Sequence, residues 1–253
     1  EVHVGSRWLI PDLIIRRNTL FPKGLSQVVV NMSEVGVITG SKFRTYRIIR
    51  DLLGSDTDFR VPETYYAKTP NQAIRIAEDL LVKGKTLVIK PNLGEKGKDI
   101  YLIRGYSDLK IFEKRMYRKS ISFVVQEFID SFKIREDGVS FVFDLRVYGF
   151  LGEFVSCHIR RAGKPVGSGS WWEWGISNIS SGGLYMPVLR GSYTGIVKWS
   201  RKVYSATPFK SIKVDKYAFV MDDSLIKRIR RATRKVVGAI GKAVYEVIRD
   251  KRA

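Results

Sequence analysis

Hydrophobic and polar positions along this 253-residue chain change between strand-like and helix-like spacing. Residues 8–39 contain short β-type runs separated by turn residues, the pattern expected for the tail of an α/β unit. A first amphipathic helix is predicted to follow the capping residue Ser41 and to end at Gly54. After a short strand at Val61–Thr64, a second amphipathic helix is predicted to open at residues 69–70.

The middle of the chain is predicted to be mainly β. Residues 121–129 are almost continuously apolar, which is typical of a strand buried on both faces. Residues 139–148 and 153–161 alternate well enough to form an antiparallel meander, with Gly149 and Gly152 at the turn. A short helix is also expected just before this region, at Leu109–Arg118.

The last third combines a loop, a basic segment and a long helix. Residues 163–183 form a loop rich in Gly, Ser and Trp, and loops of this length are usually functional or mobile. Residues 195–220 are basic and β-leaning without a firm assignment. Asp222–Ser224 can cap a final helix with a basic face, and that face is read either as a solvated surface or as a docking surface for RNA or an acidic protein.

Composition narrows the function classes. The single cysteine, Cys157, excludes an intramolecular disulfide framework and a cysteine-based zinc site, and indicates a reducing, cytoplasmic setting. No apolar run approaches the roughly 20 residues of a membrane helix, so no membrane partner is expected. With 45 Lys+Arg against 25 Asp+Glu, the net charge of +20 favours polyanionic partners, although a basic surface can also serve solubility alone.

The stretch Thr86–Ile100 carries the clearest candidate chemistry. A β-type run ends on Lys90 and passes into a loop with glycines at Gly94 and Gly97, before a second apolar run begins. The glycines allow backbone N–H groups to approach an anion, and the lysine can place its ammonium on the same phosphates. A glycine-bearing hairpin with a surface lysine is the plain alternative.

Four motifs in order give the chain a resemblance to a known family. The first is a lysine at a helix start, and the second is a Val-Ile-Lys-Pro strand with a glycine loop. The third is a buried strand that ends in Gln-Glu-Phe-Ile. The fourth is an Asp-Leu-Arg strand, followed by an arginine on the adjoining strand and then by Asn with Gly-Gly. In that order they begin at Lys42, Val88, Gln126 and Asp144. The chain resembles the ATP-grasp superfamily from about Asp12 to about Gly183, most closely the branch with ribosomal-protein glutamate ligases and amino-group-carrier ligases.

This resemblance implies an α+β fold of two lobes with antiparallel sheets and a nucleotide cleft between them. Three regions are expected: residues 1–40 as the remnant of an N-terminal α/β lobe, residues 41–120 as the subdomain with the glycine-rich loop, and residues 121–253 as the C-terminal subdomain with the long basic helix.

The resemblance also implies the residues that hold ATP. Two lysines would contact its phosphates, the glycine loop would cover them, backbone groups at the strand end would hold adenine, and an aspartate would meet the ribose. These cofactor-binding residues are Lys42, Lys90, Gly94, Gly97, Gln126, Glu127, Phe128, Ile129 and Asp130.

The implied chemistry is formation of an acyl-phosphate from a carboxylate and ATP, followed by attack of an amine, with Mg²⁺ neutralising the transferring phosphoryl group. Arg146 and Arg160 would hold the acyl-phosphate or the substrate carboxylate, since a guanidinium fork suits both. Asn178 completes this catalytic set. Ordinary ion pairs for the arginines and a turn role for the asparagine are the alternatives.

The chain departs from the family pattern in its metal ligands. The family places an Asp or Glu on one strand and Glu-x-Asn on the next, whereas this chain offers only Glu246. Residues 243–249 are either the first metal strand, if Gly238 or Gly241 stops the helix, or a continuation of the helix. Ile176 also stands where relatives often carry an arginine. The chain is therefore interpreted either as trimmed at both ends or as a reduced relative without catalysis.

Two functions follow from these expectations. The first is an ATP-dependent carboxylate–amine ligase that acts on an acidic carrier protein or a protein terminus recruited by the basic surface. The second is a catalytically degenerate relative that serves as a basic binding module for nucleic acid or a large assembly, with loop tryptophans stacking on bases. Those tryptophans can equally form a hydrophobic plug for their own loop.

Overall fold

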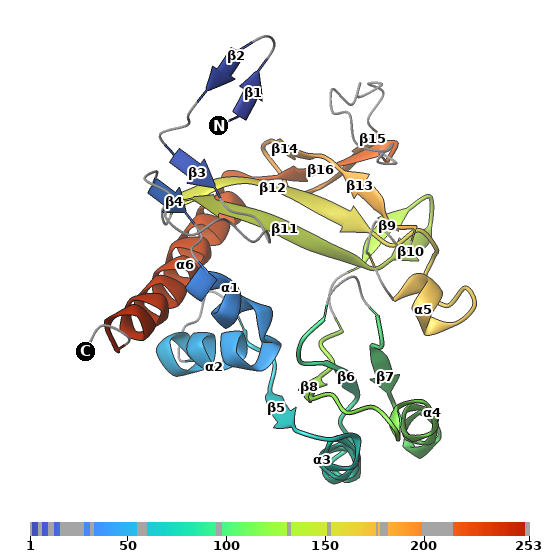
Figure 1. The fold of residues 1–253 in the computed structure, drawn as a ribbon. Helices are drawn as coiled ribbons and strands as arrows, with labels where there is room; N and C mark the ends of the chain where they lie inside the picture. The colour runs from blue at the N-terminus through green and yellow to red at the C-terminus, as the bar shows by residue number, and fades with distance from the viewer. Residues whose placement is uncertain are drawn as a thin grey trace.

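The computed structural model of this protein has a first lobe with one sheet and a second lobe with two (Figure 1). Helix α2 (Lys42–Leu53) contacts the first lobe, helix α6 (Asp223–Asp250) contacts the second, and the two helices pack on one another. It describes residues 2–4, 7–9, 13–15, 28–30, 33–54, 60–94, 98–130, 133–150, 153–175, 177, 182–198 and 215–250.

The first lobe is a four-stranded antiparallel sheet with two helices on one face. The strands, in sheet order, are β5 (Thr64–Ala67), β8 (Phe123–Glu127), β6 (Leu87–Pro91) and β7 (Tyr101–Ile103). Helices α3 (Pro70–Val82) and α4 (Tyr106–Met116) cover the face that carries the apolar side chains of the strands (Figure 1). The fully buried residues Leu87, Ile89, Ile103, Phe112 and Phe123 belong to this core.

The helix boundaries in this lobe follow the predicted caps. Helix α2 (Lys42–Leu53) begins after Ser41, whose Oγ accepts a hydrogen bond from Arg44 N at 3.3 Å. Helix α3 begins after Thr69, whose Oγ1 accepts from Gln72 N at 3.2 Å. Both predicted helix starts are therefore confirmed.

Two local predictions in this half of the chain were wrong. The strand predicted at Val61–Thr64 lies at Thr64–Ala67, because Pro62 has no N–H to donate to a ladder while the following Tyr-Tyr pair favours one. Helix α1 (Ser33–Gly40) falls in a region predicted to be β-type. Its two glycines and β-branched residues weaken the helical signal in the sequence.

The second lobe contains two three-stranded sheets. The first has the antiparallel order β11 (Phe143–Phe150), β12 (Glu153–Arg161) and β13 (Leu184–Met186), which confirms the predicted antiparallel pairing. The predicted bounds were wrong, since Val139–Phe141 pairs instead with Ile134–Glu136 and Gly149 lies within β11 rather than at the turn. The second has the order β14 (Val188–Arg190), β16 (Tyr217–Met221) and β15 (Gly195–Lys198). The β14–β16 pair is parallel, in contrast to the antiparallel sheets predicted.

Smaller paired elements complete the architecture. The hairpin of β9 (Ile134–Glu136) and β10 (Val139–Phe141) is antiparallel. The short helix α5 (Trp171–Trp174) lies in the predicted tryptophan-rich loop. Nearer the N-terminus, β1 (Val2–Val4) pairs antiparallel with β2 (Arg7–Leu9), and β3 (Leu13–Ile15) pairs in parallel with β4 (Val28–Val30). The predicted α+β class is confirmed.

The two faces of the β11–β12–β13 sheet differ in chemistry. Phe143, Leu145, Ile159 and Met186 lie on one face and pack with residues of β14, β15 and β16. Because side chains alternate along a strand, Asp144, Arg146, His158 and Arg160 share the opposite face. The polar face is therefore the one turned away from the second sheet.

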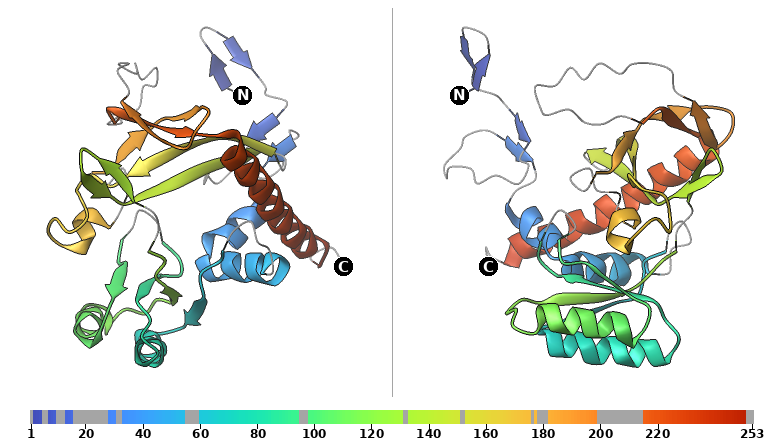
Figure 2. Two further views of the ribbon diagram at one scale, coloured as in Figure 1. Left: turned by 180° about the vertical axis from the view of Figure 1, so that it is seen from behind. Right: turned by 90° about the vertical axis from the view of Figure 1, so that its right-hand side faces the viewer.

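Helix α6 (Asp223–Asp250) runs from the second lobe to α1 and α2 (Figure 2). Leu225 N donates to Asp222 Oδ1 at 2.8 Å, so the predicted cap is present. The helix continues through Gly238 and Gly241 and includes residues 243–249, so the strand alternative for that segment was wrong. Of the helices described, none combines the length and the apolar character needed to cross a membrane.

Strand β8 belongs to the first-lobe sheet, between β5 and β6, although it follows the boundary expected at residues 120/121. The sheet therefore draws on both of the regions that this boundary separates. The division into residues 1–40, 41–120 and 121–253 stays a prediction.

Candidate functional site

Lys90 lies near the end of β6, on the sheet face opposite α3 and α4. Leu87 and Ile89 of the same strand are buried in the core, so alternation directs Lys90 to the other face. There its Nζ donates to Gln126 Oε1 at 2.6 Å, and Gln126 Nε2 donates to Thr64 Oγ1 at 2.6 Å. Gln126, which the sequence assigned to the strand end that holds the nucleotide, thus orients the Lys90 ammonium.

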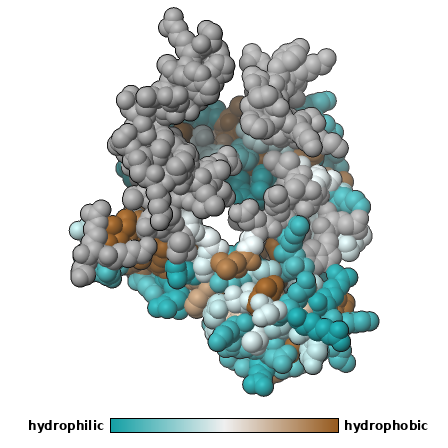
Figure 3. Space-filling view, viewed as in Figure 1, coloured by the Kyte–Doolittle hydropathy of each residue, from teal (hydrophilic) through white to brown (hydrophobic). Residues whose placement is uncertain are grey.

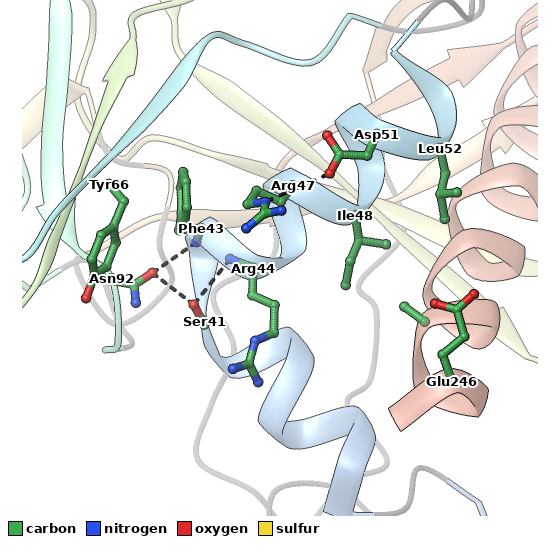
Figure 4. Close-up of a pocket in the computed structure, with 11 residues that line it drawn as sticks. Ser41, Phe43, Arg44, Arg47, Ile48, Asp51, Leu52, Tyr66, Asn92 and Glu246 are labelled. Atoms are coloured by element: carbon green, nitrogen blue, oxygen red, sulfur yellow. Dashed lines mark hydrogen bonds and ion pairs between the residues drawn. The ribbon is translucent and has the colours of Figure 1, made fainter. Parts of the chain in front are cut away.

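Lys42 reaches the same region from the first residue of α2. Its Nζ donates to the carbonyl oxygens of Gly94 at 2.8 Å and Asn92 at 3.4 Å. Asn92 Oδ1 in turn accepts from Phe43 N at 2.9 Å and from the Ser41 hydroxyl at 3.1 Å (Figure 4). Asn92 is only 7% exposed, so a buried amide fastens the start of α2 to the loop after β6.

The two ammonium groups act on one another electrostatically. Burial and, to a smaller extent, the positive charge of Lys42 together lower the pKa of Lys90 to about 8. A buried ammonium whose main charged neighbour is another ammonium is costly, and an anion between them would relieve that cost. The arrangement is therefore suited to a polyphosphate.

The end of β8 lines a cavity of about 620 Å³ to which both lobes contribute residues. In the space-filling view a gap separates the upper part of the molecule from the lower part (Figure 3). Glu127, Phe128, Ile129 and Asp130 all line the cavity. The N–H groups of Glu127 and Phe128 donate to the carbonyl oxygens of Glu63 and Thr86, each at 2.9 Å. Those two donors already serve the fold, so recognition of a ligand there must use other groups.

Carboxylates in this cavity are paired with basic side chains. Glu127 accepts two hydrogen bonds from Arg60 Nη2, at 2.8 and 3.0 Å, and Asp130 pairs with Lys133. These contacts reduce the negative charge that an anionic ligand would meet.

Arg146 and Arg160 lie on the second lobe, around Asp144. Arg160 donates to both Asp144 oxygens, at 3.1 and 2.6 Å, and Arg146 donates at 3.1 Å. Burial acts to raise the pKa of Asp144, but hydrogen bonds from Arg160 and Ser177 and the charge of Arg146 outweigh it and lower that pKa. The sequence predicted both arginines on adjoining strands but did not identify Asp144 as their shared partner.

His158 is a candidate functional residue that the sequence did not single out. It pairs with Arg146 across the β11–β12 ladder, and its ring lies between those of Tyr148 and Tyr185, at centroid distances of 5.5 and 4.7 Å. Burial, followed by the charge of Arg160, lowers its pKa, so the imidazole is neutral at pH 7. The two-residue spacing between His158 and Arg160 was the available signal.

The residues described do not fit a magnesium ion. Glu246 is exposed on α6 and lines a cavity of about 540 Å³ together with Asp51, Arg44 and Arg47 (Figure 4). Within the described part of the chain, no group of three or more His, Cys, Asp or Glu side chains is placed to hold a metal. Gly97 and Asn178, predicted for the phosphate loop and the catalytic set, lie outside the described residues.

Comparisons with known proteins give a weak structural likeness. No family model matches the chain, and no curated protein matches its sequence. Among solved structures, it is similar to the crystal structure of a RimK-domain ATP-grasp protein from Sphaerobacter thermophilus DSM 20745, with a TM-score of 0.38 and 17% identity over 85% of this chain and 71% of that chain. At that TM-score the likeness carries no functional argument.

Proposed function

We propose that this chain is an ATP-binding protein of the ATP-grasp type, with the polyphosphate held between Lys42 and Lys90. The observation that carries the proposal is the convergence of these two ammonium groups from separate elements, with the pKa of Lys90 lowered to about 8. A half-buried lysine that donates to a neutral amide and feels the charge of a second lysine is suited to an anionic ligand rather than to a structural ion pair. The order of motifs in the sequence supports ATP as that ligand.

Each neighbouring residue has a specific part in this proposal. Gln126 orients the Lys90 ammonium through its amide oxygen, and Asn92 fixes the start of α2 from which Lys42 projects. The carbonyl of Gly94 holds the Lys42 ammonium in the absence of phosphate. Residues Glu127–Asp130 line the cavity in which the nucleoside would sit.

The reaction that we propose is ATP-dependent joining of a carboxylate to an amine. ATP would supply the phosphoryl group that activates the carboxylate. Arg146 and Arg160 would orient the carboxylate substrate, and to do so they would exchange part of their contact with Asp144. An acidic protein or carrier is the proposed partner, because a net charge of +20 steers acidic surfaces toward this chain.

Isothermal titration with ATP and with inorganic triphosphate tests the binding step. Lys42→Met and Lys90→Met should each weaken both ligands by at least about tenfold, because each removes a charge-assisted contact. Lys114→Met, at an exposed position in the last turn of α4, should leave both affinities unchanged. Absence of ATP binding at millimolar concentration would refute the proposal, and ADP release over candidate acids and amines would then test the reaction.

The basic surface of α6 favours a second function, the binding of nucleic acid. Its side chains at Lys227, Arg228, Arg230, Arg231 and Arg234 are exposed. Part of this basic face packs against β12: Arg234 pairs with Glu153 at 2.7 Å, and the Arg230 guanidinium lies 5.7 Å from the Phe154 ring centre. The remainder faces outward, as a nucleic-acid-binding surface would.

A further inference from the structure

The tryptophan-rich loop delivers two indole rings to the cavity at the end of β8. Trp171 and Trp174 line the second-lobe side of the 620 Å³ space, and Phe128 and Ile129 line the first-lobe side. Small-molecule sites commonly occupy about 300–1,000 Å³ and combine apolar walls with a few polar groups. This cavity has both the size and the walls of such a site.

Helix α5 carries both rings, and Gly175 lies against one of them. Trp171 and Trp174 stand three residues apart on α5, so they project from neighbouring positions on one face of that turn. Gly175 N donates to Trp171 O at 2.7 Å, and a Cβ added at Gly175 would lie 2.3 Å from Trp171 Nε1. Only glycine fits against this indole, which makes Gly175 a positioning residue for the ring.

The cavity is within reach of the lysine pair. Thr86 lines the cavity and lies four residues before Lys90 along an extended segment, about 13 Å at roughly 3.3 Å per residue. Glu127, another lining residue, directly follows Gln126, which accepts the hydrogen bond from Lys90. A ligand with a flat apolar group at one end and phosphates at the other would span these two places.

We propose that Trp171 and Trp174 form the second-lobe wall of a nucleobase-binding cavity, with the base held between these indoles and Phe128–Ile129. The inference rests on the proposed ATP binding and extends it, since it names the residues of the second lobe that recognise the base. Stacking on aromatic faces is favourable for every base, so the cavity accepts purine nucleotides without strict selection by hydrogen bonds. In this proposal the tryptophans bind the base of a mononucleotide rather than the bases of a nucleic acid strand.

The test compares ATP with inorganic triphosphate, which lacks the base. Isothermal titration is carried out on the full chain and on Trp171→Ala, Trp174→Ala and Gly175→Ala. Each variant should weaken ATP by between about 5-fold and about 150-fold, the range for one lost stacking contact, and should leave triphosphate affinity unchanged. Trp171→Phe should recover most of the ATP affinity. Tyr117→Ala, at an exposed aromatic position after α4, is the control.

The outcomes separate this inference from the function on which it rests. If the chain binds triphosphate and ATP equally well and the tryptophan variants change neither, the base-binding wall is refuted while polyphosphate binding stands. If neither ligand binds wild-type protein, the proposed function fails and the wall fails with it. Equal loss of both ligands, with a lowered unfolding temperature, would show that the tryptophans only support the fold. Weaker binding of a single-stranded oligonucleotide with unchanged ATP affinity would assign the indoles to a polymer.

Discussion

Lys90 shows how one buried charge can report on ligand binding. Its pKa of about 8 lies below the ordinary value of 10.5, so in the free protein part of the Lys90 population is neutral at pH 8. A bound polyphosphate would favour the charged ammonium and raise that pKa again. Binding near pH 8 is therefore expected to take up protons.

Titration of triphosphate at pH 8 in buffers with different ionisation enthalpies should reveal this uptake as a buffer-dependent apparent enthalpy. Affinity should also decline as pH rises above about 8, because the lysine must first gain its proton. In Lys90→Met the uptake should disappear. Identical proton uptake in the variant would show that another group is responsible.

Glu136 is a buried carboxylate with incomplete partners. Arg161 Nε donates to Asp215 Oδ2 at 2.6 Å, so Glu136 Oε1, 2.9 Å from the same nitrogen, has the charge attraction without a hydrogen bond. Burial raises the pKa of Glu136 to about 7; Arg161 acts against this shift, and Asp215 adds to it. Two carboxylates thus compete for one guanidinium.

This competition predicts a pH-dependent gain from Glu136→Gln. Between about pH 4.5 and pH 7 the folded state holds a proton that the unfolded state has lost, so the free energy of unfolding falls as pH rises through this window. The neutral glutamine avoids that loss. Urea unfolding should show the variant more stable at pH 8, on the order of 1–2 kcal/mol, and little changed at pH 5. A destabilised variant at pH 8 would mean that the ionised Glu136 supports the fold.

At the scale of elements, Asn92 couples helix α2 to the sheet of the first lobe. Its side-chain oxygen serves the N-terminal end of a helix that begins fifty residues earlier in the sequence, and its backbone carbonyl accepts from Lys42 N at 3.1 Å. Because Asn92 supplies this cap, the stability of the start of α2 is linked to the position of Lys42, which is a candidate phosphate-binding residue.

Asn92→Ala should therefore reduce both stability and triphosphate affinity. Loss of a capping side chain costs about 1 kcal/mol, and the displaced α2 start should move Lys42 and weaken the ligand severalfold. Thr69→Ala removes the cap of α3, which lies on the opposite face of the sheet, and is the matched control. It should lower the free energy of unfolding by a similar amount without changing affinity. If the two variants changed triphosphate affinity equally, Asn92 would have no specific role in the site.

Sequence reasoning succeeded where a local rule determines the element. The caps at Ser41 and Thr69, the β11–β12 pair and the long C-terminal helix all follow from spacing over a few residues. It failed at α1, where glycines and β-branched residues hide a helix whose fully buried Ile38 shows that tertiary packing supports it.

The candidate site was predictable only in part, because its residues meet through tertiary structure. The resemblance to a family placed Lys42 and Lys90 together, and the structure brings their charges close enough to interact. No local pattern could reveal that Asp144 holds both Arg146 and Arg160, or that Trp171 lies at the end of β8. Such contacts depend on which faces of distant elements meet.

At the scale of the whole molecule, which carries a net charge of +20, the salt dependence of binding distinguishes the two proposed functions. A half-buried lysine pair acts on one ligand over short distances, whereas an exposed basic helix attracts any polyanion over roughly 8–10 Å at physiological salt. Affinity for nucleic acid through α6 should therefore depend steeply on salt, and affinity for ATP in the lysine site much less.

Charge reversal on α6 can test this separation. Lys227→Glu combined with Arg228→Glu changes two exposed side chains far along the chain from Lys42 and Lys90. If α6 binds nucleic acid, the variant should weaken a single-stranded RNA severalfold at low salt and reduce the slope of log affinity against log salt, since fewer counterions are released. ATP affinity should stay unchanged. Unaltered RNA binding with the same salt slope would remove α6 from that role.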